Sequence, residues 1–217
     1  MTTAQPSTTG PMLAQGEPLQ VPPNREADNL IDLVHRAVER FPDREAIRWK
    51  ASKTQRAEGE GDGAGWVSRT YRETWDWITE LSLGLRDLGL GPGDAACVVG
   101  RTRPEWVIGD LAALATGAMT APIYPQSEPG QAAFILNNVG AKLVIVENAQ
   151  QAAKIEGIRS QVPTLQHVVK IEDIAGKLDA LPEAFPVENT TADDAAFLHF
   201  TSGTTGMPRA LCMCMER

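Results

Sequence analysis

An alternation of strand-like and helix-like segments between residues 95 and 171 constrains the fold of this 217-residue chain more than any other feature. Short apolar runs are typical of buried strands, and apolar residues three or four positions apart are typical of helices. Strands are predicted at 95–99, 118–123, 142–146 and 165–171, and helices at 104–115, 129–138 and 149–160. Because short links between such segments imply right-handed βαβ crossovers, we predict an α/β fold with a parallel sheet.

The residues before this region predict two helices and a hairpin. Asp28 or Asn29 is in position to cap a first helix that ends near Phe41. The predicted strands 45–49 and 65–70 flank a polar loop at 51–65, and an amphipathic helix follows over 71–88. Residues 1–24 are rich in Thr, Gln, Pro and Gly and lack periodicity, which predicts a disordered tail.

A stretch rich in glycine and hydroxyl groups follows the last predicted strand, residues 195–200. It reads Thr201-Ser202-Gly203-Thr204-Thr205-Gly206-Met207-Pro208. Glycines let a backbone approach a ligand closely, and amides and hydroxyls donate hydrogen bonds to phosphate oxygens. Since ligands of open parallel sheets bind beyond the carboxyl ends of strands, the stretch predicts a phosphate-binding loop. It lacks the Gly-Lys-Ser/Thr ending of a Walker A loop, and an ordinary polar turn is the alternative.

With Arg209, this stretch resembles the Thr-Ser-Gly-Thr-Thr-Gly-x-Pro-Lys-Gly signature of the adenylate-forming (AMP-binding) synthetases. Three further segments resemble the amino-terminal region of long-chain fatty acid–CoA ligases. They are Arg103-Pro104-Glu105-Trp106, Pro122-Ile123-Tyr124-Pro125, and Phe134 to Lys142. The likeness runs from about Asn29 to Pro208. It implies that residues 25–208 are an incomplete amino-terminal domain of such an enzyme.

The resemblance implies that a carboxylic acid, expected to be a fatty acid, reacts with ATP to give an acyl-adenylate. A thiol, usually that of coenzyme A, then displaces AMP. By the same resemblance, the ATP phosphates are held by Thr201, Ser202, Gly203, Thr204, Thr205 and Gly206, and Thr201 helps to hold Mg²⁺. Pro208 stiffens the exit of the loop. Arg209 stands where the family has Lys and keeps the positive charge.

The end of the chain departs from the family pattern. Ala210 stands where family members carry Gly, and we interpret residues 209–217 as an aberrant tail left by a frameshift or a premature stop. The family's Tyr-Gly-x-Thr-Glu segment, its ribose-binding Asp and its carboxy-terminal catalytic Lys are not found in these 217 residues. We therefore expect the polypeptide alone to be inactive. We also expect strand 195–200 to lack neighbouring strands, with poor solubility or partial folding as the consequence.

Three alternatives stay open. The chain is part of a ligase for another carboxylic acid, or it is a non-catalytic fragment that retains phosphate binding. Cys212 and Cys214 form a Cys-x-Cys pair that could instead be a metal or redox site, although ligand-spaced His residues are lacking.

Composition excludes other classes of protein. The net charge of −8 argues against a nucleic-acid binder, which would be basic. The longest weakly polar run, 111–124, is shorter than the roughly 20 residues of a membrane span and contains Pro122. The chain has three cysteines in no recognisable framework, and no apolar signal segment precedes Arg25. These features predict a cytoplasmic protein.

Overall fold

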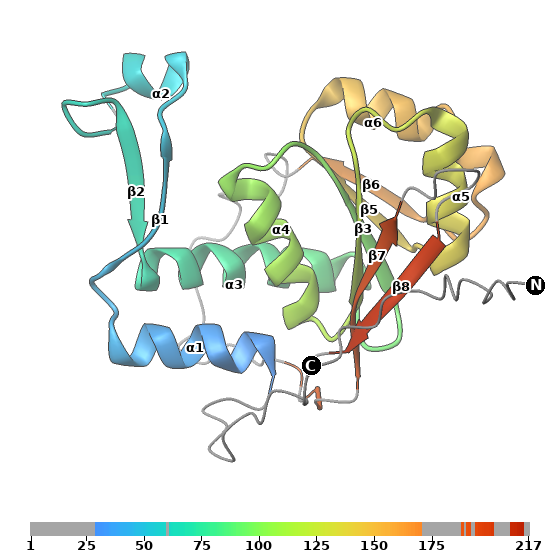
Figure 1. Ribbon diagram of the computed structural model, residues 1–217, viewed down its shortest axis with the longest axis horizontal. Coiled ribbons are helices and arrows are strands. Elements are labelled where there is room, and N and C mark those ends of the chain that lie inside the picture. The colour runs from blue at the N-terminus through green and yellow to red at the C-terminus, as the bar shows by residue number, and fades with distance from the viewer. Residues whose placement is uncertain are drawn as a thin grey trace, which may run out of the picture.

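The computed structural model describes residues 29–59, 61–170, 188, 190–191, 194–201 and 209–214, although the side chains of residues 54, 201 and 209–214 lie outside this description. Two sheets are present, a six-stranded sheet of order β6-β5-β3-β4-β7-β8 and the two-stranded sheet β1-β2. The five strands β3 to β7 run parallel, and β8 runs antiparallel to β7. The predicted α/β fold with a parallel sheet is confirmed (Figure 1).

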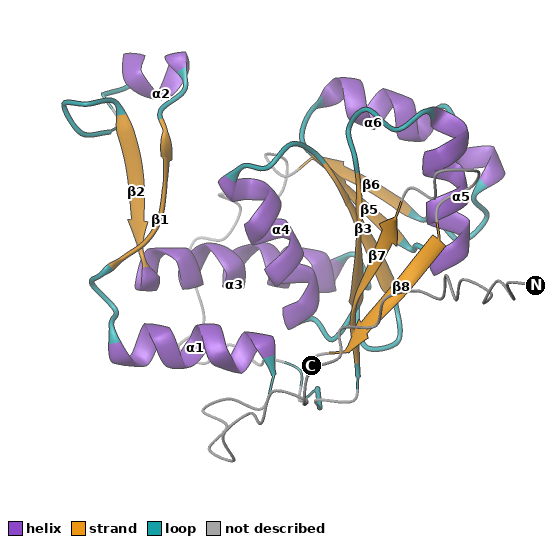
Figure 2. Cartoon of the chain, in the orientation of Figure 1, coloured by secondary structure: helices purple, strands orange, loops and turns teal. Residues whose placement is uncertain are grey.

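The amino-terminal part contains three helices and a hairpin. The elements are α1 (Leu30–Arg40), β1 (Glu45–Lys50), α2 (Lys53–Ala57), β2 (Trp66–Thr70) and α3 (Tyr71–Asp87). Asn29 caps α1 through its side chain, which accepts a hydrogen bond from the amide of Asp32 at 2.8 Å. The β1–β2 hairpin stands out from the rest of the molecule (Figure 2). The segment 51–65 that we predicted as a loop contains the short helix α2, in which Ser52 and Gln55 form reciprocal hydrogen bonds across the first turn.

The central part alternates as the sequence predicts. Its elements are β3 (Ala95–Val99), α4 (Pro104–Ala115), β4 (Met119–Ile123), α5 (Pro129–Val139), β5 (Leu143–Val146), α6 (Ala149–Glu156), the 3-10 turn η1 (Arg159–Gln161) and β6 (His167–Lys170). The predicted helix 149–160 is wrong at its end, because Gly157 closes α6 and a separate turn follows. Most of the residues between β6 and β7 lie outside the part of the chain that the structure describes. β7 (Ala195–Thr201) and β8 (Arg209–Cys214) then complete the sheet.

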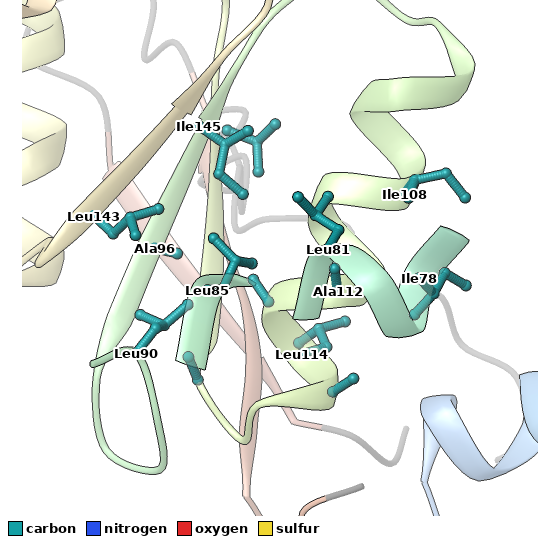
Figure 3. Packing of buried hydrophobic residues seen from close by; sticks show 14 of the residues in the cluster. Ile78, Leu81, Leu85, Leu90, Ala96, Ile108, Ala112, Leu114, Leu143 and Ile145 are labelled. Atoms are coloured by element: carbon teal, nitrogen blue, oxygen red, sulfur yellow. The ribbon is translucent and has the colours of Figure 1, made fainter. Parts of the chain in front are cut away.

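Two apolar layers cover the opposite faces of the large sheet. Side chains of one strand alternate between the faces, so Ala96 and Val98 of β3 pack with α3 and α4, whereas Cys97 and Val99 pack with α5 and α6. Leu81, Leu85 and Ile108 are buried in the first layer (Figure 3). The sheet is therefore held rigidly between two helical layers, and its carboxyl edge is left for the loops.

Candidate functional site

The carboxyl edge of the parallel strands brings together the chain segments to which the sequence assigns function. β3, β4 and β5 end at Val99, Ile123 and Val146, and β7 ends at Thr201. The helix after β3 leads to β4 on one side, while the helix after β5 leads to β6 on the other side. A crevice forms where connections leave in opposite directions, and ligands of open α/β sheets bind at such points.

The predicted phosphate-binding loop joins β7 to β8 at this edge. Thr201 is the last residue of β7, and Arg209 is the first residue of β8, paired with it across the antiparallel ladder. The other predicted residues, Ser202, Gly203, Thr204, Thr205, Gly206 and Pro208, lie outside the described residues. The structure thus fixes the two ends of the predicted loop at the carboxyl edge of the sheet.

The expectation that strand 195–200 lacks neighbours is wrong. β7 pairs with β4 on one side through Thr120 and Phe197, and with β8 on the other side. The hydroxyl group of Thr120 also donates a hydrogen bond to the carbonyl oxygen of Ala196 at 3.4 Å. The prediction failed because residues 209–214, beyond the domain boundary that we drew at residue 208, form the second partner strand.

An open cleft of about 310 Å³ lies where β3 and β4 end. It is lined by Gly100, Arg101, Thr102, Trp106, Tyr124 and Gln126, among others. Trp106 and Tyr124 come from two of the sequence segments that resemble fatty acid–CoA ligases, and the fold brings these segments into one wall. Sequence reasoning missed the cleft because the order of strands in the sheet, which makes β3 and β4 neighbours, was not predicted.

A nearly buried carboxylate at the end of β5 lies beside Gly100 and Arg101, two residues of the cleft wall. The side chain of Glu147 is only 7% exposed. It accepts hydrogen bonds from the backbone amide of Arg101 at 2.9 Å and from the side chain of Asn148 at 3.1 Å. The guanidinium of Arg101 lies 3.5 Å from the same carboxylate and is itself 73% exposed. Glu147 therefore holds the chain after β3 and keeps a positive charge beside the cleft.

The structure describes no alternative metal or membrane-spanning element. In its described part, no three His, Cys, Asp or Glu side chains converge in a way that could bind a metal ion. Among the described helices, none is both long enough and apolar enough for a membrane span. The Cys-x-Cys alternative stays a prediction, because the side chains of Cys212 and Cys214 lie outside the description.

An open parallel sheet in which one strand leads into a sequence rich in Gly, Ser and Thr is typical of α/β domains that bind phosphate groups. The sequence profile of the family described as AMP-binding enzyme matches residues 34–213, a range that includes every strand except the last residue of β8. The chain therefore belongs to the AMP-binding enzyme family, whose members are adenylate-forming ligases.

Curated relatives include fatty acid–CoA ligases. The long-chain-fatty-acid–CoA ligase FadD15 of Mycobacterium bovis is 36% identical over 155 residues, which cover 66% of this chain and 26% of FadD15. A long-chain-fatty-acid–CoA ligase of Thermus thermophilus is 27% identical over 206 residues, which cover 91% of this chain and 36% of that protein. The chain thus spans about a quarter to a third of the length of these relatives.

Solved structures of the same fold include CoA ligases. The anthranilate CoA ligase AuaEII, in complex with anthranoyl-AMP, matches with a TM-score of 0.73 at 20% identity, over 88% of this chain and 36% of that chain. A Mycobacterium tuberculosis fatty acyl CoA synthetase matches with a TM-score of 0.70 at 22% identity, over 86% and 34% of the two chains. At these identities the likeness shows the fold alone.

Proposed function

We propose that this chain supplies the amino-terminal, phosphate-binding part of an ATP-dependent ligase that joins a fatty acid to coenzyme A. The observation that carries the proposal is the match to the AMP-binding family, which runs through both strands that flank the predicted loop. The identity of 36% to FadD15 favours a long-chain fatty acid as the substrate. A ligase for another carboxylic acid is the second candidate, because the solved structures of this fold include the anthranilate CoA ligase AuaEII.

The residues of the predicted loop fit a nucleoside triphosphate. Thr201, Ser202, Thr204 and Thr205 supply hydroxyl donors, Gly203 and Gly206 permit close approach of the backbone, Pro208 stiffens the exit, and Arg209 supplies a positive charge. The described ends of the loop, Thr201 and Arg209, stand at the carboxyl edge where such a ligand binds. A hydroxyl oxygen such as that of Thr201 also suits Mg²⁺, which would offset the negative charge of the phosphates.

The proposed reaction needs negative groups to be brought together. The fatty acid carboxylate attacks the α-phosphate of ATP, pyrophosphate leaves, and the thiol of coenzyme A then displaces AMP. The role of this chain is to hold and orient the triphosphate through the donors of the predicted loop, which lowers the cost of bringing two anions into contact. The other catalytic groups of the family are proposed to come from outside these 217 residues.

The free, buried thiol of Cys97 supports a reducing compartment such as the cytoplasm.

Equilibrium dialysis of the 217-residue chain with ATP and Mg²⁺ tests the proposal. We expect saturable binding that becomes about tenfold or more weaker in Thr204→Ala, because one charge-assisted hydrogen bond contributes about 1.5–3 kcal/mol. The matched control is Thr164→Ala, which changes an exposed threonine before β6. Absence of saturable binding, or equal binding by Thr204→Ala, would overturn the proposal. With palmitate and coenzyme A added, the chain is expected to release no more pyrophosphate than Thr204→Ala does.

A further inference from the structure

The loop that follows β4 is held from the side by α6. Gln151 and Lys154 stand three positions apart and therefore on one face of this helix. The side-chain amide of Gln151 donates to the carbonyl oxygen of Pro125 at 3.2 Å, and the amine of Lys154 donates to the same oxygen at 2.8 Å. Lys154 also donates to the carbonyl oxygen of Ser127 at 3.2 Å. Two side chains of one helix thus fix two backbone positions of this loop.

The two side chains are themselves firmly placed. Gln151 is buried, and its amide oxygen has no hydrogen-bond partner among the residues that the structure describes. Burial lowers the pKa of the Lys154 amine, and the nearby carboxylate of Glu128 acts against this shift. A buried amide with only one end satisfied and a partly desolvated amine are costly to maintain. The hydrogen bonds to Pro125 and Ser127 offset part of this cost, so they favour one position of the loop relative to α6.

We call the hydrogen bonds of Gln151 and Lys154 to the loop after β4 the clamp. The residue that the clamp presents is Tyr124. It lies directly before Pro125, lines the cleft at the ends of β3 and β4, and is 67% exposed. Most large apolar side chains of the described residues are covered, and Tyr124 is the most exposed of the exceptions. An aromatic ring that is held out at the carboxyl edge of the sheet is available for contact with a ligand.

The sheet register places Tyr124 beside the start of the predicted phosphate-binding loop. Thr120 of β4 pairs with Phe197 of the parallel strand β7. Tyr124 comes four residues after Thr120, and Thr201 comes four residues after Phe197. Since neighbouring strands lie about 4.8 Å apart, the two residues leave the sheet at the same level on adjacent strands. A ligand held at the end of β7 therefore comes within reach of the tyrosine ring.

We propose that Tyr124 contacts the ATP held at the end of β7, and that Gln151 and Lys154 are the positioning residues that present its ring. This inference rests on the proposed function for the identity of the ligand. The clamp itself depends only on the hydrogen bonds between α6 and the loop after β4.

Fluorine NMR of the chain labelled with 3-fluorotyrosine tests both parts. The chain has only two tyrosines, so Tyr124→Phe assigns both signals, and Tyr71 at the start of α3 is an internal reference. Addition of ATP is expected to shift the Tyr124 signal by more than its linewidth and to leave the Tyr71 signal in place. We also expect Tyr124→Ala to weaken ATP binding about threefold to tenfold, as for loss of one aromatic contact. Phe41→Ala removes another exposed ring, at the end of α1, and serves as the control.

The outcomes separate this inference from the proposed function. If dialysis shows ATP binding but the Tyr124 signal does not move, the contact is refuted and the proposed function stands. If ATP does not bind, the proposed function fails, and the contact fails with it.

The clamp has its own variants. Lys154→Met and Gln151→Leu are expected to move or broaden the Tyr124 signal without ligand, whereas Lys154→Arg, which keeps a charged donor, retains the original signal. An unchanged Tyr71 signal shows that each variant is folded, and Lys53→Met in α2 is the control for loss of an exposed amine. A Tyr124 signal that stays in place in both Lys154→Met and Gln151→Leu would refute the positioning role.

Discussion

The carboxyl group of Asp110 in α4 lies close to the hydroxyl group of Thr120 in β4. The same hydroxyl group lies 3.4 Å from the carbonyl oxygen of Ala196 in β7. One oxygen of Asp110 is buried and has no hydrogen-bond partner among the described residues. Burial raises the pKa of this carboxyl to about 6, and the nearby hydroxyl group of Thr120 opposes the rise. Ionisation of this carboxyl, which lies between α4 and the sheet, therefore lowers the free energy of unfolding.

This cost predicts that Asp110→Asn stabilises the fold in a pH-dependent way. The folded pKa of about 6 lies above the ordinary value of 3.8, so the penalty is absent below pH 4, grows as the pH rises through 6, and is complete above it. We expect the variant to be more stable by about 1–3 kcal/mol at pH 7.5 and nearly equal to the original chain at pH 4. Urea unfolding at both pH values measures the difference. Asp43→Asn, at an exposed turn, should show no such change, and a pH-independent effect of Asp110→Asn would contradict the prediction.

Gly100 is predicted to resist substitution because of its neighbour Glu147. A Cβ atom added at Gly100 would lie 3.1 Å from the Cβ of Glu147 and 3.5 Å from the ring of Trp106. Since Glu147 is tied to the backbone of Arg101, it cannot move without loss of that hydrogen bond. Gly100→Ala is expected to lower the free energy of unfolding by about 1–3 kcal/mol.

The matched control is Gly130→Ala, in the first turn of α5, where an added Cβ meets no atom within 4 Å. We expect that variant to be neutral or slightly more stable, because alanine restricts the unfolded chain. Thermal unfolding compares the two. Equal melting temperatures for both variants would show that the contact with Glu147 is not restrictive.

Cys97 is predicted to be chemically inert in the folded chain. It is fully buried in the middle of β3, and burial raises the pKa of its thiol well above the ordinary value. Because the thiolate is the reactive form, a Cys212→Ser, Cys214→Ser variant should react with iodoacetamide only after denaturant is added. Mass spectrometry follows the labelling. Rapid modification without denaturant would mean that the layer of α5 and α6 opens readily.

The sequence predicted the repeating part of the fold well, for a physical reason. Strands that are covered on both faces must be apolar throughout, as in Leu143–Val146, and the intervening helices carry caps that are visible in the sequence, such as Pro104. The order of the strands cannot be read from such local patterns, because it depends on whether each crossover connection places the next strand on one side or the other of the preceding strand. This explains why both the partners of β7 and the cleft between β3 and β4 were missed.

The candidate site was predicted in part. The composition of residues 201–208 and their place after an apolar strand marked one end of the site, and the structure puts Thr201 and Arg209 at the expected edge. The residues that shape the rest of this edge gave weaker signals. Glu147 and Lys154 act through backbone amide or carbonyl groups of distant segments, and local sequence patterns do not report such contacts.

The arrangement of the large sheet has a consequence for the order in which it can assemble. β3, β4, β5 and β6 all come from residues 95–170, and each crossover between them spans a short stretch of chain. β7 reaches its place beside β4 only after a detour of about 70 residues, from Ile123 to Ala195, which makes its pairing the one with the longest loop to close. On a ribosome, the four-stranded unit can therefore form while β7 is still being synthesised. β7, which leads into the proposed nucleotide site, then docks together with β8 onto a surface that already exists.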